Sequence, residues 1–393
     1  MNARVTILAA AIAASTLVGC SGKHTQTQKA AATAQWNSAR ASVLGSLAKD
    51  QYDSGNLGKS RQSVDQAMQL DPKNVGFHVL SARIDIEQAK LESAQKRLTI
   101  AAELDPKNAE IDYLFGVIHQ RWQRPEAARV AYGAASTKNP GDIAYVLAEA
   151  EMLVELDRRP EALKLLQARV VYFEHSAAMR DAIAQLLEQA GNFPDAVEFY
   201  RQASVLDGDD LGIRERLGNL LYRGGEYAEA LSQLRRVLRS PDVGTRTDLV
   251  LMAAECELQV GSPAEARRRY DEVTATEPNN AVAWLGVAKS SLRMGELRRA
   301  EGGAVKAAAI MPKSAEMQMV LGYVRLKQAR FEDAVVCFRR ASAVDHTSAV
   351  SLSMTGYALE QQGKIADAAG MYRKALAIDP KDELALKALA VVD

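Results

Sequence analysis

Prolines that end helices recur in this chain on an interval of 34 residues or its multiples. They are Pro72, Pro106, Pro140, Pro278, Pro312 and Pro380. A fixed period between about 20 and 50 residues is typical of a solenoid, in which each repeat buries its apolar face against its neighbour. The period therefore predicts one elongated array in place of the two or three globular domains that 393 residues ordinarily form.

The prolines define the repeats when each is counted as position 32. Residues 41–382 then divide into ten repeats of 34 residues, with Thr245 and Arg246 as two extra residues between repeats six and seven. The repeats begin at Ala41, Val75, Ala109, Ile143, Ala177, Leu211, Thr247, Ala281, Ala315 and Ala349. Residues 383–393 begin one more first helix, which we expect to cap the array.

Small residues occupy fixed positions in every repeat. Position 8 is always Ala or Gly, and position 20 is Ala in all repeats except the first, which has Ser60. Two helices approach closely only where a small residue faces the neighbouring helix. Position 15 is Gly in six repeats, as a helix end in the left-handed conformation requires. Each repeat is therefore predicted to be a helix, a turn and a second helix, which makes the fold class all-α.

This pattern resembles the tetratricopeptide repeat. The residues that carry the resemblance are Trp284 at position 4, Leu321 and Gly322 at positions 7 and 8, Ala334 at 20, Ala341 at 27 and Pro312 at 32. The resemblance implies a right-handed solenoid of about ten helix-turn-helix repeats with a C-terminal capping helix. It also implies a protein or peptide partner that binds in the concave groove.

Two segments depart from the pattern. Repeat four has Arg169 at position 27 and Glu174 at position 32, so we expect its second helix to run long. The loop after repeat six displaces its proline to Pro241 and contains the two extra residues. We therefore predict that any bend lies at residues 240–246.

The N-terminus has the pattern of a lipoprotein signal peptide. Val5 to Thr16 is apolar but too short to cross a bilayer comfortably. Leu17-Val18-Gly19-Cys20 resembles the bacterial lipobox, which implies cleavage after residue 19 and lipidation of Cys20. By the same resemblance, Ser21 indicates the outer membrane, with the array facing the periplasm. We expect residues 20–34 to form the anchor and a polar tether, and the array to occupy residues 35–393, with its leading helix beginning near Gln35.

The sequence favours neither nucleic-acid binding nor catalysis. The chain has 49 basic and 49 acidic residues, so no net charge attracts nucleic acid. The five histidines do not pair at helical spacing, and Cys256 and Cys337 are expected to be buried packing residues. Gly55 to Ser60 lacks the first glycine and the strand of a phosphate-binding loop. We expect no enzyme activity, metal, cofactor or small-molecule substrate.

In the repeat family the concave face is formed chiefly by positions 2, 5, 9, 12 and 13 of the first helices. Two zones of partner-binding candidates follow from these positions. The acidic zone contains Glu151, Glu155, Asp181, Glu188, Glu215, Asp248 and Glu255, opposed mainly by Arg223. The apolar zone contains Leu251, Leu258, Leu285, Leu292, Met319, Tyr323 and Leu326, bordered by Lys289, Arg293 and Lys327.

Each zone has a second interpretation. The acidic residues are also typical of a solvated helix face. The apolar residues mark either a binding groove or packing between neighbouring repeats. The functional hypothesis is a membrane-anchored assembly scaffold that resembles repeat lipoproteins of pilus, secretion or exopolysaccharide machinery. The alternative is an adaptor for cell-wall or polysaccharide enzymes.

Overall fold

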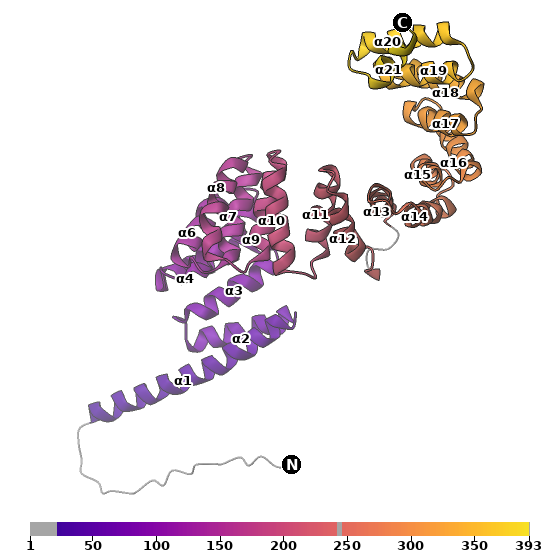
Figure 1. The fold of residues 1–393 in the computed structure, drawn as a ribbon. Coiled ribbons are helices and arrows are strands. Elements are labelled where there is room, and N and C mark those ends of the chain that lie inside the picture. Colours follow the sequence, from indigo (N-terminus) through magenta and orange to yellow (C-terminus); the bar gives the residue numbers. More distant parts are fainter. Residues whose placement is uncertain (1–21, 242–245, 393) are drawn as a thin grey trace. The chain divides into compact units, whose positions relative to one another are not determined.

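The computed structural model describes residues 22–241 and 246–392, and in these residues every element is a helix. The signal peptide, Cys20 and Ser21 lie outside the described residues. The chain divides into two compact blocks, Met1–Phe173 and Glu174–Asp393, called here the N-terminal block and the C-terminal block (Figure 1). None of the helices in the described ranges is long and apolar enough to cross a membrane.

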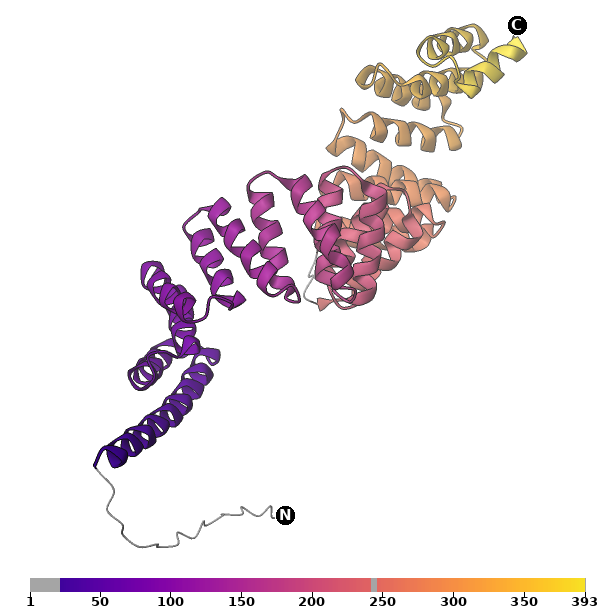
Figure 2. The ribbon, with the colours of Figure 1, turned by 90° about the vertical axis from the view of Figure 1, so that its left-hand side faces the viewer.

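The N-terminal block contains repeats one to four as helix pairs (Figure 2). Its elements are α1 (Gly22–Asp53), α2 (Leu57–Leu70), α3 (Val75–Glu87), α4 (Leu91–Leu104), α5 (Ala109–Arg121), α6 (Pro125–Lys138), α7 (Ile143–Glu155), α8 (Arg159–Arg169) and the 3₁₀ helix η1 (Val170–Tyr172).

The C-terminal block contains repeats five to ten and the capping helix. Its elements are α9 (Ala177–Gln189), α10 (Phe193–Leu206), α11 (Leu211–Arg223), α12 (Tyr227–Val237), α13 (Thr247–Gln259), α14 (Pro263–Thr276), α15 (Ala281–Arg293), α16 (Leu297–Ile310), α17 (Ala315–Lys327), α18 (Phe331–Val344), α19 (Ala349–Glu360), α20 (Ile365–Ile378) and α21 (Glu383–Val392).

The predicted repeat frame is confirmed. The first helices of repeats two to ten begin at the predicted residues, from Val75 in α3 to Ala349 in α19, and α21 is the predicted capping helix. Each of these helices follows an N-cap at position 34, and in most of them the cap is Asn, Asp or Ser. Asp210, for example, accepts a hydrogen bond from the backbone N–H of Ile213. Such caps satisfy the free N–H groups of a first turn and so fix where a helix begins.

Small residues allow the helix pairs to close as predicted. Ala48, Ala82 and the other position 8 alanines are buried. A Cβ atom added to Gly116 would lie 2.4 Å from the ring of Tyr132, and one added to Gly322 would lie 2.5 Å from Phe338. The large aromatic residues at position 24 therefore pack directly on the backbone of the first helix. Cys256 and Cys337 are buried free thiols, as expected.

Two local predictions are wrong. The predicted tether is helical, because α1 begins at Gly22 and not near Gln35. Residues 28–35 contain mainly Ala, Gln, Lys and Thr with no Gly or Pro, and Ala, Gln and Lys favour a helix. The second helix of repeat four does not run long: α8 ends at Arg169 and is followed by η1.

The division between the blocks falls after Phe173, at the end of repeat four. The predicted bend at residues 240–246 stays a prediction, because residues 242–245 lie outside the described residues.

Candidate partner-binding surfaces

The N-terminal block has a solvent-lined hollow on the inner face of repeats one to three. Its volume is about 470 Å³. The lining comes from α1, α3, the start of α5 and the N-caps Asn74 and Asn108, and several lining residues occupy positions 2, 5, 9, 12 and 13. We call it the N-terminal hollow. It is lined by Ser42, Gly45, Ser46, Lys49, Tyr52, Asp53, Asn74, Gly76, Phe77, Val79, Leu80, Arg83, Asn108 and Glu110.

Small residues create the space in this hollow. A Cβ atom on Gly45 would lie 2.2 Å from Cε1 of Phe77, so only glycine lets that ring pack against α1. Ser42, Ser46 and Gly76 are short and exposed. Larger side chains at these positions would fill the space that a bound segment needs.

The charges in the N-terminal hollow are mixed and partly paired. Arg83 Nε donates a 2.7 Å hydrogen bond to Oε1 of Glu110, which links α3 to α5. Burial raises the pKa of Tyr52 and Glu87 adds to that rise, while Arg83 lowers it. Lys49 is exposed at position 9 of repeat one. The hollow thus presents a cation and an aromatic hydroxyl beside apolar rings.

The sequence analysis missed this hollow. It looked for large charged or apolar residues at the inner positions, whereas the hollow results from small ones. The signal was available in Ser42, Gly45 and Gly76, which occupy positions 2, 5 and 2 of consecutive repeats.

The structure places the acidic zone in both blocks. Glu151 and Glu155 are exposed on α7 of the N-terminal block. In the C-terminal block, Arg216 Nη2 donates to both carboxylate oxygens of Asp181 at 2.8 Å. Arg246 binds Glu215 at 2.9 Å, and it also binds Asp248. Arg223 is therefore not the main opposing charge, since much of the zone is neutralised within the chain.

Tyrosine hydroxyl groups neutralise part of the same zone. Tyr200 donates to Oε2 of Glu188 at 3.0 Å, and Tyr270 donates to Oε2 of Glu255 at 3.1 Å. In both cases a tyrosine at position 24 holds a carboxylate on the first helix of its own repeat. These carboxylates support the helix pairs in addition to lying on the inner face.

Two predicted residues border a second hollow, in repeats five and six. The guanidinium of Arg223 lies 5.0 Å from the centre of the Phe193 ring, and Arg223 Nη1 lies 3.4 Å from Oε1 of Glu188. Phe193 is 41 % exposed and was not among the predicted residues. Hollows of about 430 and 410 Å³ adjoin these side chains. Attraction between a cation and an aromatic face orders this surface.

The apolar zone is mainly packing between repeats. Leu258 and Leu285 are 1 % and 4 % exposed, so their assignment to the partner-binding face is wrong. Leu251 and Leu292 are half-buried and pack against core clusters. The same holds for Met319, Tyr323 and Leu326, which pack against the core of repeats nine and ten. Neighbouring first helices lie close enough for a leucine at position 5 or 12 to fill the space between them.

The basic residues beside the apolar zone also have partners within the chain. Arg293 Nη1 donates to the carbonyl oxygen of Leu258 at 2.5 Å, and Lys289 binds Glu316 at 2.5 Å. Lys327 is exposed. Of the border residues, Arg293 and Lys289 therefore join one repeat to the next.

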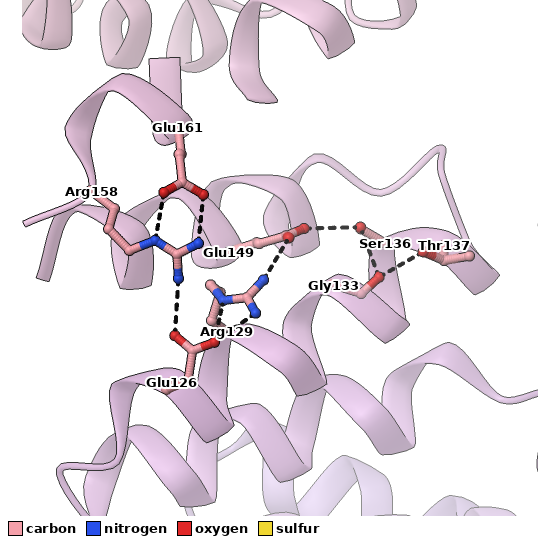
Figure 3. A network of polar contacts seen from close by, with 8 residues as sticks. All are labelled: Glu126, Arg129, Gly133, Ser136, Thr137, Glu149, Arg158 and Glu161. Atoms are coloured by element: carbon pink, nitrogen blue, oxygen red, sulfur yellow. Dashed lines mark hydrogen bonds and ion pairs between the residues drawn. The ribbon is translucent and has the colours of Figure 1, made fainter. Parts of the chain in front are cut away.

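A polar network joins repeats three and four (Figure 3). Glu126 accepts hydrogen bonds from Arg129 at 2.7 Å and from Arg158 at 3.2 Å. Ser136 Oγ donates to Glu149 at 3.4 Å, and Arg129 lies 4.0 Å from the same carboxylate. Burial raises the pKa of Glu149, while Ser136 and Arg129 lower it. The network links α6 to α7 and to the N-cap of α8, and gives no sign of a catalytic arrangement.

Comparison with known protein families agrees with this architecture. The family model for the C-terminal domain of cilia and flagella-associated protein 70 matches residues 202–392, and a tetratricopeptide repeat model matches residues 178–213. The chain is a tetratricopeptide repeat protein. No curated protein matches its sequence.

Three solved structures of tetratricopeptide repeat or related helical proteins illustrate the similarity. The MamA protein is 18 % identical, with 44 % of this chain and 94 % of that chain covered, at a TM-score of 0.39. A thermophilic TPR protein of Thermus thermophilus is 20 % identical, covering 46 % and 98 % of the two chains, at a TM-score of 0.39. The APC/C hetero-tetramer Cut9–Hcn1 is 11 % identical, covering 94 % of each chain, at a TM-score of 0.46.

Proposed function

We propose that this protein is a lipid-anchored scaffold of a bacterial envelope that binds a segment of a partner protein in the N-terminal hollow. A tetratricopeptide repeat fold is itself typical of protein–protein interaction scaffolds. The observation that carries the more specific proposal is the hollow, which is open, concave and lined by the inner positions of consecutive repeats.

The lining suits a peptide segment. Tyr and Arg are enriched among the residues that dominate binding energy at protein interfaces, and Tyr52 and Arg83 lie here together. The amide side chains of Asn74 and Asn108 can hydrogen-bond to an extended backbone. Arg83 is already held by Glu110, so little ordering cost falls on the scaffold when the segment binds.

The hollow is tested by capture of partners in cells. Lys49→Glu reverses the exposed charge inside the hollow, and Lys59→Glu is the matched control on the exposed side of α2. Ser46→Trp fills the hollow, and Gln69→Trp on α2 is its control. After crosslinking and pull-down with the anchored protein, we expect the two hollow variants to lose the partner and both controls to keep it. Equal capture by all four variants would show that the partner binds elsewhere.

The anchor rests on the sequence of the N-terminus. Cys20 follows Leu-Val-Gly after an apolar segment, and α1 begins two residues later. Two or more acyl chains, each contributing about 0.8 kcal/mol per buried CH₂, suffice for stable anchoring. Cys20→Ser should move the protein from the membrane fraction to the soluble fraction and abolish labelling by a fatty-acid probe. Continued lipid labelling of Cys20→Ser would overturn the anchor while leaving the hollow untouched.

For the partner, the resemblance suggests a subunit of pilus, secretion or exopolysaccharide machinery in the periplasm. Such a role predicts one dominant partner in stoichiometric amount. A mixed set of cell-wall enzymes in the same pull-down would favour the adaptor instead.

A further inference from the structure

The first helix of the array has an apolar face that nothing in the N-terminal block covers. Trp36 is 65 % exposed, Val43 is 70 % exposed and Leu47 is 45 % exposed. Together with Arg40, these residues follow each other at intervals of four, three and four, so they form one stripe along α1. We call it the α1 stripe. Figure 2 shows the first half of α1 extending beyond α2.

Equivalent positions in later repeats are covered by a helix. Val43 and Leu47 occupy positions 3 and 7 of repeat one. At position 3, Ile111 is 1 % exposed and belongs to the same core cluster as Leu98 of α4. Met317 is 3 % exposed and belongs to the same cluster as Ala304 of α16. The surface that repeat one leaves open is thus one that, in its neighbours, receives an antiparallel helix of the preceding repeat.

We propose that the α1 stripe is the contact surface between two copies of this chain, paired antiparallel through α1. The spacing of the stripe reads the same in both directions. When Trp36 lies opposite Leu47 of the second copy, Arg40 lies opposite Val43 of that copy, and both relations occur twice. The four-three alternation is also that of an antiparallel helix pair with a seam of apolar contacts.

The charges along α1 fit the same register. Lys29 and Asp50 are exposed and lie on the stripe side of the helix, near its opposite ends. In the antiparallel pair, Lys29 is about 6 Å along the axis from Asp50 of the second copy, at about 1.5 Å per residue. A lysine side chain spans this distance, so each pair of helices gains two opposite-charge contacts. A parallel pair would instead place Lys29 beside Lys29.

The contact does not compete with the N-terminal hollow. Ser42, Ser46 and Lys49 line the hollow from another side of α1, while Ala41, Gly45 and Ala48 are buried in the N-terminal block. A dimer therefore presents two hollows, one from each copy.

The first test is the mass of the mature chain, from residue 20 with Cys20→Ser, measured by sedimentation equilibrium across a concentration range. We expect a reversible dimer. Val43→Asp should weaken association about tenfold or more, which corresponds to about 1.4 kcal/mol. Val130→Asp changes an equally apolar residue, 57 % exposed on α6, and should leave the mass unchanged. Circular dichroism should be the same for both variants. A monomer at every concentration overturns the proposal.

The second test reads the register. Trp36→Cys chains mixed with Leu47→Cys chains should form a disulfide under mild oxidation, because these positions face each other. Trp36→Cys alone should not, because its copies lie about 16 Å apart along the axis, beyond disulfide reach. Efficient crosslinking of Trp36→Cys alone overturns the antiparallel pairing.

The charge contact gives a third, independent reading. Lys29→Glu and Asp50→Lys should each weaken the dimer, and the double variant should restore it. If Val43→Asp instead reduces binding to vesicles of anionic lipid while the wild-type chain remains monomeric, the stripe faces a membrane and the proposal is wrong.

Discussion

The indole Nε1 of Trp284 donates a hydrogen bond of 2.8 Å to the carbonyl oxygen of Pro278. Trp284 is at position 4 of its repeat, and Pro278 is at position 32 of the preceding one. Three other repeats make the same contact with different donors. The pairs are His78 with Pro72, Arg214 with Gly208, and Gln318 with Pro312. The turn that the prolines mark in the sequence is therefore held by the next repeat.

Trp284→Phe should destabilise the C-terminal block by about 1 kcal/mol, because a hydrogen bond across this turn is lost. Lys306 Nζ lies 3.8 Å from the centre of the same ring, and Lys306→Met removes only this cation. Urea unfolding followed by circular dichroism separates the two contributions. The same midpoint for Trp284→Phe and the wild-type chain would show that the donor has no stabilising role.

Position 15 adopts a positive φ in all ten repeats, although only six have glycine there. Ala329 has a φ of 60°. Such a conformation is costly for a residue with a Cβ atom. Ala329→Gly should therefore stabilise the protein by about 0.5–1 kcal/mol. Ala309→Gly, at an exposed site inside α16, should destabilise it by a similar amount, because glycine lowers helix stability. A loss of stability for Ala329→Gly would contradict the strain argument.

The frame of the fold was predictable because it depends on local signals. The N-cap at Asp210, the glycine at position 15 and the small residue at Gly116 each act within one helix pair. The start of α1 was not predictable from the same signals. Its first residues have no apolar period, and alanine-rich polar sequence is compatible with either a tether or a helix.

The candidate site was harder to predict, because it depends on how neighbouring repeats pack. Position 5 carries Leu285 in one repeat and Gly45 in another. The leucine fills the space between first helices, whereas the glycine opens it. A rule that assigns position 5 to the inner face cannot distinguish these outcomes, since the size of the side chain decides whether the position is core or groove.

Leu285→Ala tests the corrected assignment. A residue that is 4 % exposed leaves a cavity when it is truncated, and the cost should be about 2–5 kcal/mol. Val282→Ala, in the same helix but 54 % exposed, should change stability by less than about 0.5 kcal/mol. Thermal unfolding of both variants measures the difference. Near-wild-type stability of Leu285→Ala would return this residue to the partner-binding face.

Glu149 makes the stability of the N-terminal block depend on pH. Burial raises the pKa of this carboxyl above 4.5, although Ser136, Arg129 and Arg169 oppose the rise. The folded state then binds the proton more tightly than the unfolded state. Its stabilising contribution is present below the usual pKa of glutamate and is lost as the pH rises through the folded-state pKa.

Glu149→Gln removes the buried charge and keeps the shape. We therefore expect the variant to unfold at a higher temperature than the wild-type chain at pH 7.5, and this gain to shrink at pH 4. Glu161→Gln is the control with opposite sign, because a hydrogen bond from Arg158 lowers the pKa of Glu161. That variant should gain nothing at pH 7.5. Scanning calorimetry at the two pH values decides the matter, and a gain for Glu149→Gln that does not vary with pH would show that its charge is not the cause.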